Sequence, residues 1–367
     1  MRLCIVLPTK PKPSETFLTA HATLLSNDAT VVYFEGNVPY VDDAPIFSQS
    51  PWSRLMRKIY RVFKRKEWKW EAVWALKTTF SERADVILAE YGPTASRCIE
   101  AAKWSGVPLV THFHGFDASV DSVIEKYREK YSDVFAYSKA IVAVSRKMVD
   151  DLIGLGVDKS KIFLNPCGVD FEFFEEINCA LNPPCLVSVG RFVEKKAPHL
   201  TILAFYFARL EVKDAKLFML GGGPLDGVCK DLVVSLGLTE SVFLMGECDQ
   251  DLVKEQMAKS RGFVQHSVKA QDGDCEGTPV SILEAQSMGL PVVATRHAGI
   301  ADVIVDNETG YLSEERDIKS MSKHMVNILR EPAEARKLGS RGAKRVRHFY
   351  SMDKSIDNLK SILESSA

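Results

Sequence analysis

Short runs of apolar residues alternate with longer stretches of helical periodicity along the whole chain. The runs are rich in branched side chains and end at glycines or polar turns, which is typical of parallel strands buried on both faces. Strands that alternate with helices form doubly wound α/β sheets, whose ligand crevices open at the carboxyl ends of the strands. We expect strands at residues 3–7, 31–34, 86–89, 109–113, 141–145, 162–165, 186–189, 217–220, 243–245, 263–266 and 292–295.

A stiff extended segment divides this pattern in two. Acidic and aromatic residues from Phe171 onward give way to Asn182-Pro183-Pro184, which cannot continue a helix. At 367 residues the chain is long enough for two domains, each with its own core. We therefore expect one domain over residues 1–175, a second over residues 176–345, and a final helix within residues 346–367.

The composition is that of a globular protein. Hydrophobic residues make up 46% of the chain, and the net charge of −1 argues against a general nucleic-acid binder. The eight cysteines are scattered without a Cys-x-x-Cys pair, which fits reduced thiols in a cytosolic protein. Residues 1–7 are too short for a secretory signal, and no apolar run approaches the roughly 18 residues of a membrane span. We expect the protein to work in the cytoplasm.

Two glutamates eight residues apart, Glu276 and Glu284, suggest a binding site. Glu276 precedes a predicted helix, for which Thr278 is the expected cap and Pro279 fits the first turn, and Glu284 lies inside that helix. The free N–H groups at the start of the helix are open to an anion. This arrangement suits a nucleotide sugar, with the diphosphate on the helix and the two carboxylates on sugar and ribose hydroxyls. The alternative is an ordinary surface helix.

Further motifs follow predicted strands on either side of this pair. In order they are Gly190-Arg191, Glu194-Lys195-Lys196, Gly221-Gly222-Gly223-Pro224, Gly246, Gly289-Leu290-Pro291 and Thr309-Gly310. Taken together they resemble glycosyltransferase family 4, the retaining enzymes of the GT-B architecture, most strongly over residues 185–312. The stretch 276–279, followed by residues 295–300, is most similar to the bacterial exopolysaccharide branch, including colanic-acid-type transferases.

This resemblance implies two Rossmann-like domains that face each other across a cleft, with the last helix crossing back to the first domain. The second domain would bind the donor. Arg191 and Lys196 would hold its diphosphate and neutralise charge on the leaving group. Lys195 is expected to be a solvated surface charge, and Ala197 stands where the family usually has glycine. The remaining donor-binding candidates are Gly222, Gly223, Gly246, Gly277, Thr278, Pro279, Val280 and Glu284.

The first domain supplies a candidate catalytic histidine and a candidate acceptor site. His114-Gly115-Phe116-Asp117 matches a His-Gly-x-Asp motif of the family, which implies that His114 faces the donor sugar; a structural hydrogen bond is the alternative. His112 is the weaker of the two histidine candidates. The catalytic set is then His114, Arg191, Lys196 and Glu276. Ser14 and Glu15 either contact an acceptor sugar or cap a helix.

We expect neither a cofactor nor a metal ion in this protein. Asp272-Gly273-Asp274 has the Asp-x-Asp pattern of metal-dependent GT-A enzymes, but it occurs late in the chain. Arg191 and Lys196 already supply the positive charge that a divalent ion would provide. The nucleotide sugar, such as a UDP- or GDP-sugar, is a substrate, and the acceptor is a saccharide or a polyprenyl-linked sugar.

Residues 52–77 are unusually basic and rich in tryptophan. Apolar residues recur between the cations at near-helical spacing. A basic amphipathic helix with interfacial aromatics suits an anionic surface, so this stretch predicts peripheral binding to the inner face of the plasma membrane. The alternative is a helix packed on the core whose basic face is merely solvated.

The sequence therefore favours a metal-independent, retaining hexosyltransferase of polysaccharide or glycoconjugate biosynthesis. It would move a sugar from a nucleotide-diphosphate sugar to a saccharide or lipid-linked acceptor. Two alternatives remain, a GT-B nucleotide-sugar epimerase and a non-catalytic nucleotide-sugar-binding subunit of a polysaccharide assembly complex. Retention of Arg191, Lys196, Glu276 and Glu284 argues against the non-catalytic alternative.

Overall fold

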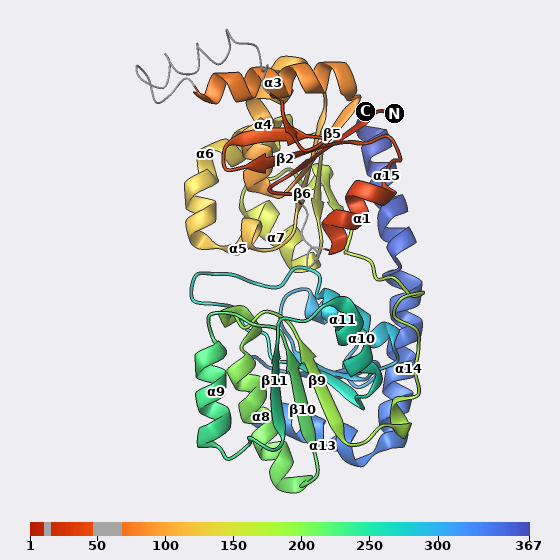
Figure 1. The fold of residues 1–367 in the computed structure, drawn as a ribbon. Coiled ribbons are helices and arrows are strands. Elements are labelled where there is room, and N and C mark those ends of the chain that lie inside the picture. The colour runs from red at the N-terminus through yellow and green to blue at the C-terminus, as the bar shows by residue number, and fades with distance from the viewer. Residues whose placement is uncertain (11–15, 47–67) are drawn as a thin grey trace.

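Two α/β units lie one above the other in the computed structural model, which describes residues 1–10, 16–46 and 68–367 (Figure 1). The upper unit holds an eight-stranded sheet in the order β4-β3-β2-β1-β5-β6-β7-β8. Its strands are β1 (Leu3–Leu7), β2 (Thr30–Glu35), β3 (Val38–Val41), β4 (Ala44–Pro45), β5 (Val86–Glu90), β6 (Leu109–Phe113), β7 (Ala140–Ala143) and β8 (Ile162–Leu164). All neighbours pair in parallel except β2 with β3 and β3 with β4.

The lower unit holds a six-stranded parallel sheet in the order β11-β10-β9-β12-β13-β14. Its strands are β9 (Cys185–Val189), β10 (Lys216–Leu220), β11 (Val242–Gly246), β12 (Gly262–Gln265), β13 (Val292–Thr295) and β14 (Gly310–Ser313). Every strand expected from the apolar runs is confirmed, with ends that differ by a few residues. Strand β14 was not anticipated, and neither were the antiparallel strands β3 and β4. A two-residue Gly36-Asn37 loop between β2 and β3 is the hairpin signal that could have found them.

Helices cover both faces of each sheet. In the first unit they are α1 (Thr16–Leu24), α3 (Trp68–Arg83), α4 (Gly92–Ser105), α5 (Phe116–Ser119), α6 (Asp121–Tyr137) and α7 (Arg146–Gly154). In the second they are α8 (Pro198–Glu211), α9 (Asp226–Ser235), α10 (Gln250–Ala258), α11 (Val280–Ser287), α12 (Ile300–Val303), α13 (Ile318–Arg330) and α14 (Pro332–Phe349). Among the described residues, no helix is both long and apolar enough to cross a membrane.

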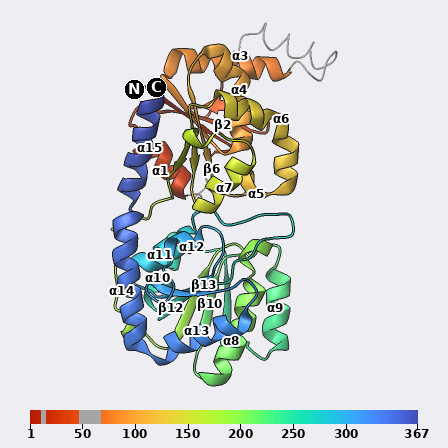
Figure 2. The ribbon, with the colours of Figure 1, turned by 180° about the vertical axis from the view of Figure 1, so that it is seen from behind.

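The last helix, α15 (Met352–Ser366), belongs to the core of the first unit. It continues from α14 along the side of the molecule and ends beside the N-terminus (Figure 2). Ile356, Leu359, Ile362 and Leu363 join one core cluster with Leu3, Ile5 and Leu7, whereas Cys4 and Val6 of the same strand belong to another. Alternation along a strand buried on both faces produces this division. The helix therefore closes one face of the first sheet.

Two connections between the units pass side by side. The segment after β8 pairs with the turn between α14 and α15, because Val169 N–H donates to Tyr350 O at 2.9 Å and Met352 N–H donates to Val169 O at 3.1 Å. A Cβ atom built on Gly168 would lie only 2.5 Å from Met352 Cα, so the two connecting segments are in direct backbone contact. The chain passes between the two sheets at these two connections. The domain limits 1–175, 176–345 and 346–367 stay predictions.

Candidate active site between the two domains

The loop that carries Glu276 is bonded to the first domain. Thr278 Oγ1 donates to Val144 O at 2.8 Å and accepts from Cys167 N–H at 3.0 Å. The prediction that Thr278 caps the following helix is therefore wrong. Helix α11 begins at Val280, after Pro279, and it has no side-chain cap. The hydroxyl that could have capped the helix instead joins the two domains.

The same loop also contacts the candidate histidine through its backbone. A Cβ atom built on Gly277 would lie 2.1 Å from His114 O, closer than any side-chain carbon can approach. Cys275 N–H donates to Ser119 Oγ at 3.2 Å, and Asp121 N–H donates to Asp272 O at 2.9 Å. Glycine at position 277 thus allows the two domains to touch beside His114.

Glu276 forms a buried ion pair with Lys196. Lys196 Nζ lies 2.9 Å from Glu276 Oε1, which also accepts from Ser267 Oγ at 3.1 Å. Burial alone would raise the pKa of Glu276, but the positive charges of Lys196 and Lys195 outweigh it and lower the pKa to about 2. Glu276 is therefore an oriented carboxylate at neutral pH, able to accept hydrogen bonds from hydroxyl groups.

Lys195 is not the solvated surface charge that we expected. Its Nζ donates to Asp274 Oδ1 at 3.0 Å and to Cys275 O at 3.2 Å, and its side chain is 11% exposed. The pair fastens the acidic loop to the turn that carries Lys196. Asp274, the second aspartate of the Asp-x-Asp pattern, thus forms an ion pair with Lys195.

Glu284 lies in a cavity between the domains. The cavity has a volume of about 490 Å³, within the range of small-molecule sites. Helix α1 contributes Thr19 and Thr23 to its wall, the connecting segment contributes Asp170, and α10 contributes Gln250. Burial raises the pKa of Glu284 to about 8, against a smaller opposing effect of Lys196. The carboxyl group is therefore mostly protonated at neutral pH and can both donate and accept hydrogen bonds.

Lys196 lies close enough to both glutamates to lower the pKa of each. Arg191 lies just after the end of strand β9 and is exposed. Lys196, Glu276 and Glu284 are thus brought together by the fold, and Lys196 is the cation common to both carboxyl groups. An anionic ligand bound at Lys196 would lie beside the ionised Glu276 and within the electrostatic influence of the neutral Glu284.

The candidate glycines form a contact among three loops. Gly221 N–H donates to Gly246 O at 2.7 Å, and a Cβ atom at Gly221 would lie 2.0 Å from Gly190 O. Gly223 is equally restricted, since its Cβ would lie 2.7 Å from Phe192 O, whereas a side chain at Gly222 would meet the side chain of Glu247. The need for glycine at 221 and 223 is therefore explained by loop packing alone.

Ala197 keeps the left-handed conformation for which glycine is better suited. Its φ is 37° and its ψ is 53°, at the point where a short turn over residues 194–196 meets α8. The side chain is fully buried. The alanine that stands in place of the family's usual glycine therefore bears the strain of a left-handed backbone conformation.

His114 is held by a carboxylate that the sequence analysis did not single out. His114 Nε2 lies 2.6 Å from Glu90 Oε2, and the His114 side chain is 5% exposed. Asp117 shapes the turn by accepting from the N–H groups of His114 at 3.0 Å and Gly115 at 2.9 Å. Glu90 ends a buried strand, so a charged residue after an apolar run was the signal that could have found it.

Several predicted residues fall outside the described part of the chain. These are Ser14 and Glu15, the acceptor candidates, and residues 52–67 of the basic stretch. The described remainder of that stretch belongs to α3, in which Val73 and Leu76 are buried and Trp74 is 57% exposed. This helix packs against α4 at the top of the first unit (Figure 1).

Two family models match adjoining parts of the chain. Residues 21–173 match "Glycosyltransferase Family 4", and residues 169–345 match "Glycosyl transferases group 1". The chain is 28% identical over 289 residues to the putative colanic acid biosynthesis glycosyltransferase WcaL of Escherichia coli, covering 77% of this chain and 71% of WcaL. It is 30% identical over 250 residues to the amylovoran biosynthesis glycosyltransferase AmsK of Erwinia amylovora, covering 67% of this chain and 61% of AmsK.

Solved structures share the fold along the whole chain. The crystal structure of Anabaena HepE in complex with UDP and glucose has a TM-score of 0.80 at 16% identity, with complete coverage of both chains. The apo form of the lipopolysaccharide outer core galactosyltransferase WaaB has a TM-score of 0.70 at 16% identity, again over both complete chains. These likenesses confirm the expected GT-B fold, and the first matching family confirms the expected family resemblance.

Proposed function

The chain belongs to the family 4 glycosyltransferases, in their exopolysaccharide branch, and we propose from this premise that it transfers a hexosyl group from a nucleoside diphosphate sugar. WcaL and AmsK are described as transferases of colanic acid and amylovoran biosynthesis, and the proposal extends that role to this chain. The acceptor would be a saccharide or a polyprenyl-linked sugar of polysaccharide assembly. None of the relatives described above is an epimerase, so the epimerase alternative has no support.

One observation carries the proposal: Lys196 is paired with the ionised Glu276, and its positive charge also acts on the neutral Glu284, which lines a cavity. A nucleoside diphosphate sugar matches this order of groups, with a dianion at the centre and hydroxyl-bearing rings on either side. The diphosphate would take the positive charge of Lys196 and the exposed Arg191. Glu284 would bind ribose hydroxyls, and Glu276 would bind hydroxyls of the donor sugar.

The chemistry that these groups support is stabilisation of departing charge. When the glycosidic bond breaks, negative charge grows on the nucleoside diphosphate, and positive charge grows on the sugar ring. Lys196 and Arg191 would stabilise the former, and ionised Glu276 the latter. These two cations replace a divalent ion in the proposed mechanism. The transfer would retain anomeric configuration, in accordance with the family.

Contact between the two domains would protect the donor from hydrolysis. The loop of Glu276 touches the turn of His114, so both candidates lie at the same domain contact. Exclusion of water there would favour transfer to a sugar hydroxyl over transfer to water. His114 would act from the first domain, with its ring orientation fixed by Glu90.

Donor binding is tested by calorimetric titration with UDP-, GDP-, ADP- and dTDP-sugars, each with and without EDTA. We expect one nucleotide to bind, with an affinity that EDTA does not change. Glu284→Gln, which keeps the shape and the neutral state of the side chain but replaces the carboxyl group with an amide, should alter that affinity, whereas Glu240→Gln, on an exposed loop, should not. Failure of every donor to bind the folded protein would contradict the proposal.

Transfer itself is tested with a radiolabelled form of the donor that binds. Incubation with lipid-extracted acceptors from a polysaccharide-producing cell should move label into the acceptor fraction. A non-catalytic binding subunit would bind the donor equally well but leave the label on the nucleotide. An epimerase would convert the sugar with no acceptor present, so product analysis separates the three possibilities.

We also propose that the enzyme works at the cytosolic face of a membrane. All eight cysteines are free and seven are buried, as suits a reducing compartment. The exposed Trp74 lies on α3, the helix that directly follows the basic residues 52–67. Co-sedimentation with vesicles that contain anionic lipid should decrease in a variant with Arg57, Arg61, Lys64 and Arg65 changed to Glu. Unchanged sedimentation would contradict this part of the proposal.

A further inference from the structure

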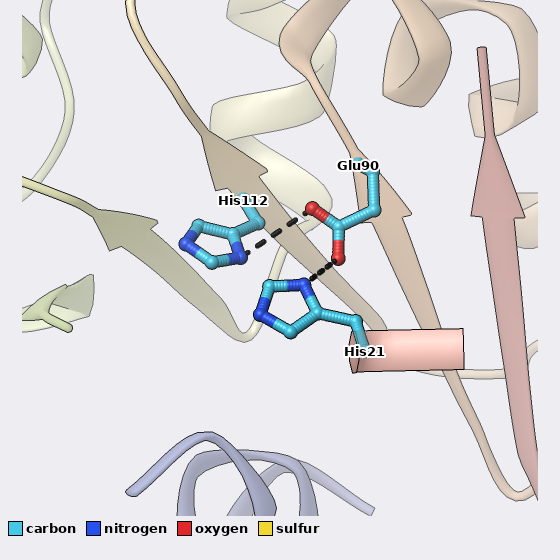
Figure 3. Close-up of side chains that lie close together, drawn as sticks. All are labelled: His21, Glu90 and His112. Carbon is cyan, nitrogen blue, oxygen red and sulfur yellow. Dashed lines mark hydrogen bonds and ion pairs between the residues drawn. The ribbon is translucent and has the colours of Figure 1, made fainter. Parts of the chain in front are cut away.

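Three side chains that are distant in sequence meet inside the first domain (Figure 3). His21 comes from α1, Glu90 from the end of β5, and His112 from β6. His21 Nδ1 lies 2.7 Å from Glu90 Oε1, and His112 Nδ1 lies 3.4 Å from Glu90 Oε2. The exposed fraction is 2% for His21, 0% for Glu90 and 1% for His112. The nitrogen and oxygen atoms all lie within 4.8 Å of one another.

The hydrogen bonds of this cluster are incomplete. Among the residues that the structure describes, neither ring nitrogen of His112 has a hydrogen-bond partner. The short separation between His112 Nδ1 and Glu90 Oε2 is thus a close approach without hydrogen-bonding geometry. A buried polar atom without a partner is destabilising, so an imidazole in this state requires an explanation.

We propose that His21, Glu90 and His112 bind a transition-metal ion of the Zn²⁺ class. Two imidazole nitrogens and one carboxylate form a ligand set that suits zinc, and the carboxylate-rich sites of Ca²⁺ and Mg²⁺ have no place for two histidines. Each of the three residues offers one atom to the ion. An ion there would give His112 Nδ1 the partner that the protein does not supply.

The surroundings of the cluster fit a bound cation. His114 Nε2 lies 2.6 Å from Glu90 Oε2, so the ring of His114 is placed to orient the carboxylate that would bind the ion.

The ion would join α1 to the sheet. His21 is the ligand on α1, and Thr19 and Thr23 of the same helix line the cavity that contains Glu284. A metal ion would therefore fix one wall of that cavity and, through Glu90, the ring of His114. It would not contact the donor diphosphate, for which Lys196 supplies the charge. This inference does not depend on the proposed donor chemistry.

The test uses the full chain, stripped of metal by a chelator and then titrated with Zn²⁺, with the bound metal measured by mass spectrometry. We expect one zinc ion per chain. Glu90→Gln and His112→Gln should lose the ion, whereas His324→Gln, a histidine of the second domain, should retain it. His114→Gln should weaken zinc binding by roughly 10- to 100-fold, because it removes the ring that orients the Glu90 carboxylate.

Replacement of zinc by Co²⁺ in the unsubstituted protein covers the case in which the buried variants do not fold. The expected spectrum has ligand-field bands of nitrogen and oxygen ligation and no thiolate charge-transfer band. A thiolate band would assign the ion to one of the eight cysteines and overturn the proposal. The proposal is likewise overturned if the folded protein binds no zinc or if folded variants of Glu90 and His112 bind it as tightly as the unsubstituted chain.

Discussion

Lys196 Nζ lies 2.9 Å from Glu276 Oε1, so the cation proposed for the donor diphosphate is already paired with the carboxylate proposed for the donor sugar. The pair is nearly buried, with side chains 18% and 6% exposed. Breaking a buried pair on one side leaves the other charge uncompensated. Each partner therefore holds the other in place until a ligand shares the charge of Lys196.

We predict that Glu276→Gln lowers kcat while donor binding survives. The amide keeps the shape of the side chain but removes the negative charge that would stabilise the developing positive charge on the sugar. Loss of one such group costs about 100- to 1,000-fold in kcat. Steady-state kinetics beside donor calorimetry measure the two effects separately. Glu314→Gln, an exposed surface variant, is the control, and an undiminished kcat in Glu276→Gln would contradict the assignment.

The raised pKa of Glu284 predicts a pH-dependent stability. An unfolded glutamate releases its proton near pH 4.5, whereas folded Glu284 retains its proton to about pH 8. Below pH 4.5 both states are protonated and the residue has no pH effect. Between pH 4.5 and 8 the unfolded state binds fewer protons than the folded state, so stability falls as the pH rises. Above pH 8 the loss is complete.

Urea denaturation at a series of pH values measures this effect. The free energy of unfolding of Glu284→Gln should fall less between pH 4.5 and 8 than that of the unsubstituted protein. Glu240→Gln should follow the unsubstituted protein throughout. Parallel curves for all three proteins would show that the carboxyl group of Glu284 is ionised in the fold.

Gly277→Ala is predicted to separate the domains locally. The new methyl group would lie 2.1 Å from His114 O, and a backbone atom cannot move away as a flexible side chain can. The nearby bonds of Thr278 to Val144 and Cys167 should weaken with it. Hydrogen exchange at Cys167 N–H should become faster, and transfer activity should fall. Gly227→Ala, a helical glycine with no atom within 4 Å of its Cβ position, should change neither.

Ala197→Gly is predicted to stabilise the fold. The left-handed conformation costs a non-glycine residue roughly 1–2 kcal/mol, and glycine would remove this cost. Glycine is also more flexible in the unfolded chain, which destabilises the fold by about 0.4–1 kcal/mol. We expect a net gain of up to about 1 kcal/mol in the free energy of unfolding. Ala204→Gly, in the middle of α8, should instead lose about 0.5–1 kcal/mol. A loss of stability in Ala197→Gly would show that its buried methyl group matters more than its backbone.

The sequence determined the strand pattern and the helix that carries Glu284. Both follow from local physics, since a strand buried on both faces needs a short apolar run and a helix needs a start and a stop. The hairpin between β2 and β3 also had a local signal, the Gly36-Asn37 turn, but the strand prediction used apolar runs alone. Local signals extended to candidate chemistry as well, because Lys196 and Glu276 follow strands whose carboxyl ends meet at one edge of a sheet.

Only the tertiary structure decided how the side chains are used. Threonine is a residue type that often caps helices, yet the hydroxyl of Thr278 donates a hydrogen bond to Val144 O, 134 residues away in the chain. From its sequence neighbours Lys195 was expected to be a solvated surface charge, yet it forms an ion pair with Asp274, 79 residues away. Glu90 contacts His21 of α1 as well as His112 and His114 at the end of β6, although these two segments are far apart in the chain. Sequence periodicity reports which side of an element is buried, but these partners are set by how two domains and several strands pack together, and no local pattern contains that information.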